Sequence, residues 1–141
     1  MKYLIFSLVL LCNGALDTSN SFVGEWKTID DETGKAKSIV KIYEQSGMLY
    51  GKITKLYRSA DEEQDPKCDE CKGAKKGQKI IGMTIVEGMI KDGDEYEDGT
   101  ILDPKNGKVY DCKMWLDGND KLMVRGYVGI FYRTQEWQRV K

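Results

Sequence analysis

Short segments of alternating apolar and polar residues, separated by tight turns, constrain the fold of this chain most strongly. The pattern is clearest in Gly99–Val140, where three consecutive strands are expected: one ending near Leu116, one from Leu122 to Val128, and one from Gln135 to Val140. Such alternation is typical of antiparallel strands with one buried face. Tight antiparallel hairpins are therefore the expected building unit.

The loop Asp117-Gly118-Asn119 connects the first two of these strands. We expect a three-residue loop with Asn119 in the left-handed conformation, because this keeps one face apolar. A five-residue loop would oppose Lys113 and Arg125, and like charges on neighbouring strands are destabilising. The favoured register pairs Met114 with Leu122, Cys112 with Val124 and Asp111 with Arg125.

The rest of the chain repeats the hairpin pattern, and a long polar loop at 58–79 interrupts it. Eight antiparallel strands in one chain close most naturally into a barrel, since closure removes exposed sheet edges. We therefore predict an all-β fold, an eight-stranded antiparallel up-and-down barrel, whose interior holds side chains or one small ligand. The expected strands are 22–29, 38–44, 49–54, 80–89, 95–102, 108–116, 121–128 and 135–140.

The N-terminus has the three parts of a secretory signal peptide: Lys2, an apolar run at 3–11, and small or polar residues up to Ala15. The run is too short to span a bilayer. We expect residues 1–15 to be a signal peptide and 16–141 a single β-barrel domain in the periplasm or outside the cell. A lipid anchor on Cys12 is the alternative, and Leu11 before it argues against that.

Charge and composition exclude several function classes. Removing residues 1–15 takes away one charged side chain, Lys2, which leaves 21 basic against 23 acidic residues and a net charge of −2. This balance gives no overall attraction to nucleic acid or anionic membranes. The chain has no histidine, which excludes Ser-His and Cys-His catalysis and imidazole zinc sites. We expect no enzyme activity, no cofactor, no metal site and no membrane span.

Three cysteines remain after the signal peptide. Cys68 and Cys71 lie in the polar loop, and in an exported protein they are expected to form a structural disulfide, with Cys112 free on the apolar face. A bond from Cys112 to either loop cysteine stays open as an alternative. A redox role for the pair would need a strand-to-helix setting that Pro66 and the charged neighbours do not favour.

Aromatic and charged residues at the two chain ends suggest how a barrel would close. Trp26 in the first strand is expected under a late arginine, in a cation–π contact of about 0.5–2 kcal/mol. Arg139 and Arg125 are both candidates for this contact, although Arg125 has a competing partner in Asp111.

These residues also carry a resemblance. Gly24-Glu25-Trp26 looks like the Gly-x-Trp signature of lipocalins and related calycins. Nearly the whole chain from Gly24 resembles domain-of-unknown-function family 2147, bacterial exported proteins described as lipocalin-like. This resemblance implies a signal peptide and a calycin-type barrel, and it implies no activity or ligand. The matching segments include Gly51-Lys52-Ile53, Cys68 with Cys71, 99–110, 122–129, Arg133-Thr134-Gln135, Trp137 and Arg139.

Our leading prediction is an exported, non-enzymatic barrel that binds a small apolar or amphipathic molecule. The alternative is a cell-envelope protein with a filled barrel that acts through its surface, with the 58–79 loop as the candidate contact region. Candidate ligand-binding residues on the inward face are Trp26, Ile53, Tyr110, Met114, Val124 and Trp137.

Overall fold

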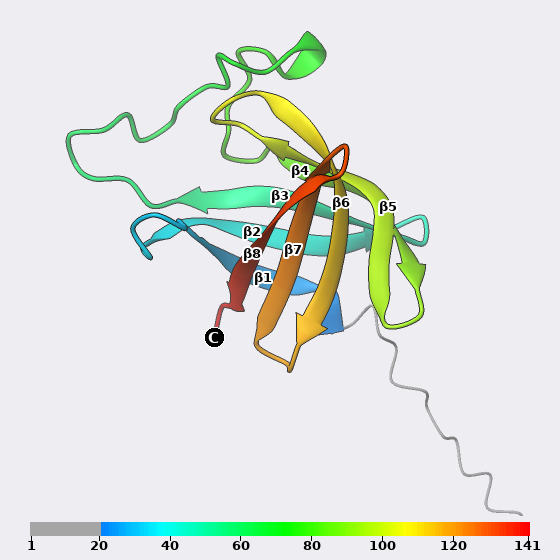
Figure 1. Ribbon diagram of the computed structural model, residues 1–141. Coiled ribbons are helices and arrows are strands. Elements are labelled where there is room, and N and C mark those ends of the chain that lie inside the picture. The colour runs from blue at the N-terminus through cyan, green and yellow to red at the C-terminus, as the bar shows by residue number, and fades with distance from the viewer. Residues whose placement is uncertain (1–20) are drawn as a thin grey trace, which may run out of the picture.

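The computed structural model describes residues 21–141, and the expected signal peptide at 1–15 with its Cys12 alternative lies outside them. Within 21–141, eight strands and one short 3-10 helix follow one another (Figure 1). The elements are β1 Gly24–Ile29, β2 Ala36–Gln45, β3 Met48–Leu56, η1 Gly73–Lys75, β4 Thr84–Asp92, β5 Glu95–Asp103, β6 Lys108–Asp117, β7 Lys121–Val128 and β8 Phe131–Arg139.

All neighbouring strands pair antiparallel in chain order, and β1 closes on β8. Trp26 is opposite Arg139 and Thr28 is opposite Trp137 across this seam. The predicted eight-stranded up-and-down barrel is confirmed. Its hairpins follow from local turn chemistry, as in the β2–β3 turn, where Ser46 and Gly47 have φ angles of 54° and 77°. Two successive left-handed residues match the twist of the flanking strands.

The β6–β7 hairpin has a register different from the expected one. Asp117 pairs with Lys121, and Gly118, with φ 69°, takes the left-handed position expected for Asn119. Lys113 is therefore opposite Arg125, the arrangement that charge repulsion argued against. The observed and predicted registers differ by two residues, so the same side chains still face inward. The observed pairs include Met114 with Val124, Leu116 with Leu122, Cys112 with Gly126 and Asp111 with Tyr127.

The two cations on this hairpin point to different partners, which explains the register. Lys113 Nζ lies 2.9 Å from Glu95 Oε2 on β5. The Arg125 guanidinium lies 4.2 Å from the ring centroid of Tyr132, and its Nε donates a 2.8 Å hydrogen bond to Thr134 Oγ1 on β8. The charge of Lys113 is thus neutralised by Glu95 on the β5 side of the hairpin, and the Arg125 guanidinium is stacked on Tyr132 on the β8 side. The predicted pair of Asp111 with Arg125 is wrong, because Asp111 is exposed opposite Tyr127.

Five strand starts differ from the expected ones, and the largest differences are at β4, which begins at Thr84, and β8, which begins at Phe131. The starts of β1, β2 and β3 differ by one or two residues. Residues 80–83 instead turn back along the long loop. The Ile80 N–H donates to Pro66 O at 3.0 Å, and the Gly82 N–H donates to Ile53 O at 2.6 Å. A turn with Gly82 at φ 93° suits only glycine well, and it delays the start of β4.

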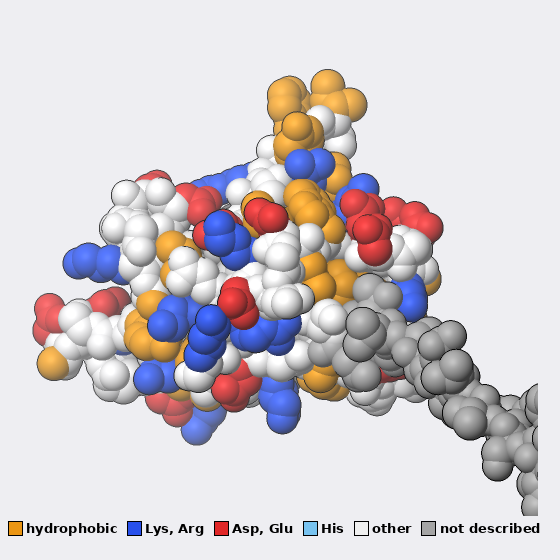
Figure 2. Space-filling model, turned by 90° about the horizontal axis from the view of Figure 1, so that it is seen from below, with side chains coloured by type: hydrophobic (Ala, Val, Ile, Leu, Met, Phe, Trp, Pro, Cys, Tyr) orange, Lys and Arg blue, Asp and Glu red, His pale blue; other side chains and the backbone are white. Residues whose placement is uncertain are grey.

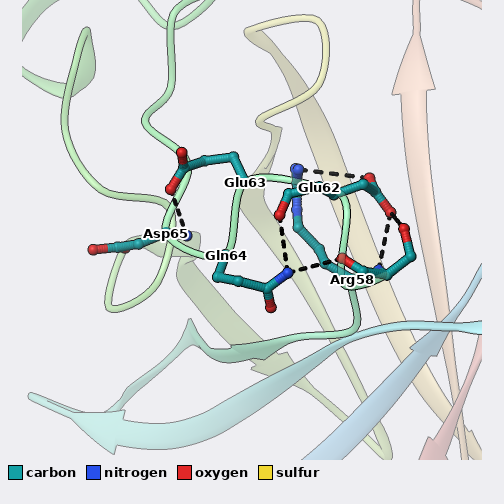
Figure 3. Close-up of polar contacts among 6 residues, drawn as sticks. Arg58, Glu62, Glu63, Gln64 and Asp65 are labelled. Atoms are coloured by element: carbon teal, nitrogen blue, oxygen red, sulfur yellow. Dashed lines mark hydrogen bonds and ion pairs between the residues drawn. The ribbon is translucent and has the colours of Figure 1, made fainter.

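The loop at 57–83 is tied to itself and to the barrel. Near its start, the Glu62 carboxylate accepts hydrogen bonds from the Ser59 N–H and hydroxyl and lies 3.7 Å from Arg58 (Figure 3). Further on, Cys68 and Cys71 form a disulfide, and both side chains are buried. Along residues 21–141, none of the helices has the length and apolar character needed to cross a membrane.

Candidate binding cavity

One end of the barrel is filled and the other is hollow, because the inward residues differ in size. Toward the filled end the strands contribute Trp26, Met114 and Leu122, all fully buried. Toward the hollow end several of the inward residues are small, including Thr28, Ser38 and Gly126. A cavity of about 650 Å³ opens there, where the β1–β2, β3–β4, β5–β6 and β7–β8 connections gather.

The wall of the cavity is mainly apolar, with a few fixed polar groups. Ile53, Ile85, Val124 and Trp137 are buried residues that line it. Thr28 Oγ1 and Ser38 Oγ are 2.6 Å apart on neighbouring strands, so this buried polar pair satisfies itself. The Trp137 Nε1–H donates to Gln135 Oε1 at 3.3 Å. An apolar wall with few polar groups is typical of small-molecule sites.

Charged side chains surround the mouth. Arg58 pairs with Glu62, and Arg133 pairs with Asp31 of the β1–β2 turn. The pKa of Glu62 is lowered, chiefly by the hydrogen bonds that its carboxylate accepts from Ser59. Glu62 therefore stays ionised as a fixed part of the rim. Lys37, Lys105 and Asp103 also line the mouth.

The filled end is sealed by the first described residues. The Trp26 Nε1–H donates to Phe22 O at 2.8 Å, and the Phe22 ring meets Tyr96 edge-on with centroids 4.8 Å apart. The Arg139 guanidinium lies 4.2 Å from the Trp26 ring centroid and donates to the Ser21 carbonyl. Access to the cavity is thus from the opposite end.

With its fold and cavity described, the chain can be compared with known proteins. Residues 24–139, from β1 to β8, match the model of a family described as "Uncharacterized protein conserved in bacteria (DUF2147)". The chain belongs to DUF2147. This confirms the family indicated by the sequence, and the match covers every strand of the DUF2147 barrel.

A solved structure supports the same fold for this DUF2147 chain. Its title is "Protein HP1028 from the human pathogen Helicobacter pylori belongs to the lipocalin family". It aligns with a TM-score of 0.71 and 20% sequence identity, covering 84% of this chain and 82% of that one. At this identity the likeness establishes the fold alone, which is lipocalin-like. No curated protein matches the DUF2147 chain.

The six predicted ligand residues separate into two groups in the DUF2147 barrel. Ile53, Tyr110, Val124 and Trp137 line the cavity. Trp26 and Met114 face inward as expected but lie in the filled end, fully buried and outside the cavity lining. Alternation identified the inward face, whereas the position along the barrel axis decides which inward residues meet open space.

The structure adds cavity residues that sequence reasoning missed. Thr28, Ser38, Ile85, Gly126 and Gln135 all line the cavity. Small or polar residues at inward positions next to apolar ones are the signal that marks them, since they leave the interior unfilled. This pattern is difficult to recognise from one sequence. The turn at 80–83 shifts the start of β4 to Thr84, so the inward positions of that strand cannot be counted from Ile80.

The cysteines and arginines named in the sequence analysis have different structural roles. Cys68 and Cys71 are bonded, as expected, and the free Cys112 is buried in β6. Burial raises the pKa of the Cys112 thiol to about 12. Arg139 is the arginine that lies over Trp26, whereas Arg125 lies over Trp115 and Tyr132.

Proposed function

We propose that this DUF2147 protein is exported and binds a small, partly apolar molecule in the open end of its barrel, without catalysing a reaction. The single observation that carries this proposal is the cavity of about 650 Å³ with its apolar wall. Its size lies within the roughly 300–1,000 Å³ range of small-molecule sites. A molecule with an apolar body and a polar end fits best, because the interior is apolar and the mouth is charged.

The polar groups of the cavity favour binding over catalysis. The Thr28 and Ser38 hydroxyls are committed to each other, and the Glu62 carboxylate is held ionised by Ser59. A general acid or base works best with a pKa near the operating pH. The lowered pKa of Glu62 points away from that role, and the chain contains no histidine.

Export rests on the sequence pattern of residues 1–15 and on the chemistry of Cys68 and Cys71. Disulfides persist mainly in oxidising compartments outside the cytoplasm. Both cysteines are no more than 2% exposed, which favours a structural bond over an exchanging one.

The cavity can be tested with the fluorescent probe 1-anilinonaphthalene-8-sulfonate. We expect one probe per barrel, with energy transfer from Trp137 in the wall. Gly126→Leu adds an apolar side chain inside the cavity, and the atoms nearest to its first added carbon belong to Tyr110 and Ile101, at ordinary contact distances of 3.4–3.9 Å. This variant should lose at least about tenfold in probe affinity, whereas Gly126→Ala should lose little. Equal affinity in both variants would place the probe elsewhere.

Native mass spectrometry of the protein purified from its own host tests the rest of the proposal. We expect a mass that lacks the signal peptide, together with a co-purified small molecule that Gly126→Leu excludes. An intact N-terminus at Met1 would contradict export. Failure to bind either the probe or a host molecule would favour the filled-barrel envelope protein instead.

A further inference from the structure

The tip of the β7–β8 hairpin exposes a cluster of large apolar side chains. Val128 is 59% exposed, Ile130 89%, Phe131 75% and Tyr132 61%, and Gly129 forms the turn between the strands with φ 59°. We call these four side chains the apolar tip. Hydrophobic side chains gather on a projecting edge of the molecule in Figure 2, in keeping with this cluster. Exposed apolar clusters of this kind mark interaction sites.

The apolar tip is continuous with the cavity. Val128, Phe131 and Tyr132 line the cavity and are also exposed outside it, whereas Ile130 does not line it. The apolar side chains of the tip are therefore contiguous with the apolar part of the cavity wall. The exposed Val109 on β6 lies near Val128 at the same rim.

Basic side chains flank the apolar tip. Lys72 and Lys108 lie beside Val109 and Val128 in a depression on the outer rim, and Lys105 lies at the cavity mouth. None of these three lysines forms a salt bridge with another residue in the described range 21–141, while Arg133 pairs with Asp31. The net charge near zero averages over the whole chain and does not reveal this local arrangement.

We propose that the apolar tip inserts into the surface of an anionic phospholipid membrane, with the cavity mouth turned toward the bilayer. Shallow apolar insertion together with basic residues is the usual chemistry of interfacial membrane binding. Where the cavity holds an amphipathic molecule, as proposed above, that molecule passes between bilayer and barrel without crossing water. The docking itself does not depend on the ligand.

A second copy of the chain is a poorer occupant of this surface. The tip is a narrow turn that carries four apolar side chains, whereas specific protein interfaces bury roughly 1,200–2,000 Å². A membrane needs no complementary shape and accepts a projecting turn directly. The unpaired lysines also match negatively charged headgroups, whereas two identical basic rims would repel each other.

Sedimentation with vesicles tests the proposal. One set of vesicles contains phosphatidylglycerol mixed with phosphatidylcholine, and the other contains phosphatidylcholine alone. We expect binding to the anionic set, and we expect Ile130→Gln to weaken it at least about tenfold because that side chain leaves the lipid. The matched control is Ile90→Gln, which removes an isoleucine 47% exposed on β4 away from the mouth and should leave binding unchanged. Lys108→Gln should weaken binding about fivefold on the anionic vesicles only.

The outcomes separate this proposal from the proposed ligand binding. Ile130 lies outside the cavity lining, so Ile130→Gln should keep its affinity for the fluorescent probe. Vesicle binding without probe binding would support membrane docking and would contradict the proposed ligand binding in the cavity. Absence of vesicle binding, or equal loss in the Ile130 and Ile90 variants, would overturn docking. Dimerisation in solution that Ile130→Gln abolishes, without vesicle binding, would assign the tip to a second copy instead.

Discussion

At the scale of single residues, Cys112 shows how position in a barrel wall controls reactivity. It lies on β6 opposite Gly126, 3% exposed, and its thiol donates a long hydrogen bond of 4.0 Å to the Lys113 carbonyl oxygen. Desolvation raises its pKa from 9.0 to about 12 because the thiolate would have to exist in an apolar interior. Spacing alone left the pairing of Cys112 open, because a sequence does not say which cysteines meet in space.

We predict that Cys112 resists alkylation in the folded protein. At pH 8 its thiolate fraction should be about a thousandfold below that of a free thiol. Iodoacetamide followed by mass spectrometry of peptides should find no adduct on Cys112 in native protein and one adduct on Cys112 after denaturation without reductant. Rapid labelling of native protein would mean that β6 opens frequently. Because the pKa is higher in the folded state, this thiol costs stability only as the pH rises from about 9 toward 12.

At the scale of elements, the long loop and the β5–β6 turn are built against each other. A Cβ atom on Gly107 would lie 1.8 Å from the Glu70 carbonyl oxygen, so the two backbones touch. The disulfide sulfur of Cys68 also lies 3.5 Å from the Pro104 carbonyl oxygen. The disulfide thus holds the loop in the shape that fits this turn.

We predict that Gly107→Ala destabilises the protein more than Gly118→Ala. Both glycines have left-handed φ angles, 73° and 69°, which should cost alanine about 1–2 kcal/mol. Only Gly107 adds a backbone clash, worth about 1–3 kcal/mol more. Urea unfolding measures both, and limited proteolysis of Gly107→Ala should cut the loop at 57–83 faster. Equal losses would mean that the loop moves aside freely.

The strands also show how much of the fold can be predicted from sequence patterns. Alternation predicted the eight strands and their buried faces, because a period of two survives any shift by two residues. It missed the β6–β7 register, since the choice depends on Glu95 and Tyr132, which come from two other strands. A local sequence pattern carries no information about contacts with strands outside its own hairpin.

At the scale of the whole molecule, closure of the barrel depends on one arginine near the end of the chain. The Arg139 Nε–H donates to Asn119 O at 2.7 Å, and the guanidinium also contacts Ser21 and the face of Trp26. It therefore joins β1, β8 and the β6–β7 turn. The hollow end, in contrast, arises from small residues scattered over several strands, so the cavity appears only once the strands are assembled.

We predict that Arg139→Lys lowers the free energy of unfolding by about 2–4 kcal/mol, because lysine lacks both the planar stack and the forked donors. The matched control is Arg133→Lys at the mouth, where arginine forms an exposed ion pair with Asp31 and the substitution should cost about 0–1 kcal/mol. Urea titrations followed by tryptophan fluorescence compare the two. Similar small effects would mean that strand pairing alone closes the barrel.

The first and last strands meet at the filled end, where the Val140 N–H donates to Glu25 O at 3.0 Å. A reporter or a solid support joined after Lys141 would therefore sit at the base of the barrel and leave the entrance unobstructed. A protein attached through its C-terminus would thus keep the opposite opening accessible to solvent, which is the geometry that an immobilised sensor requires.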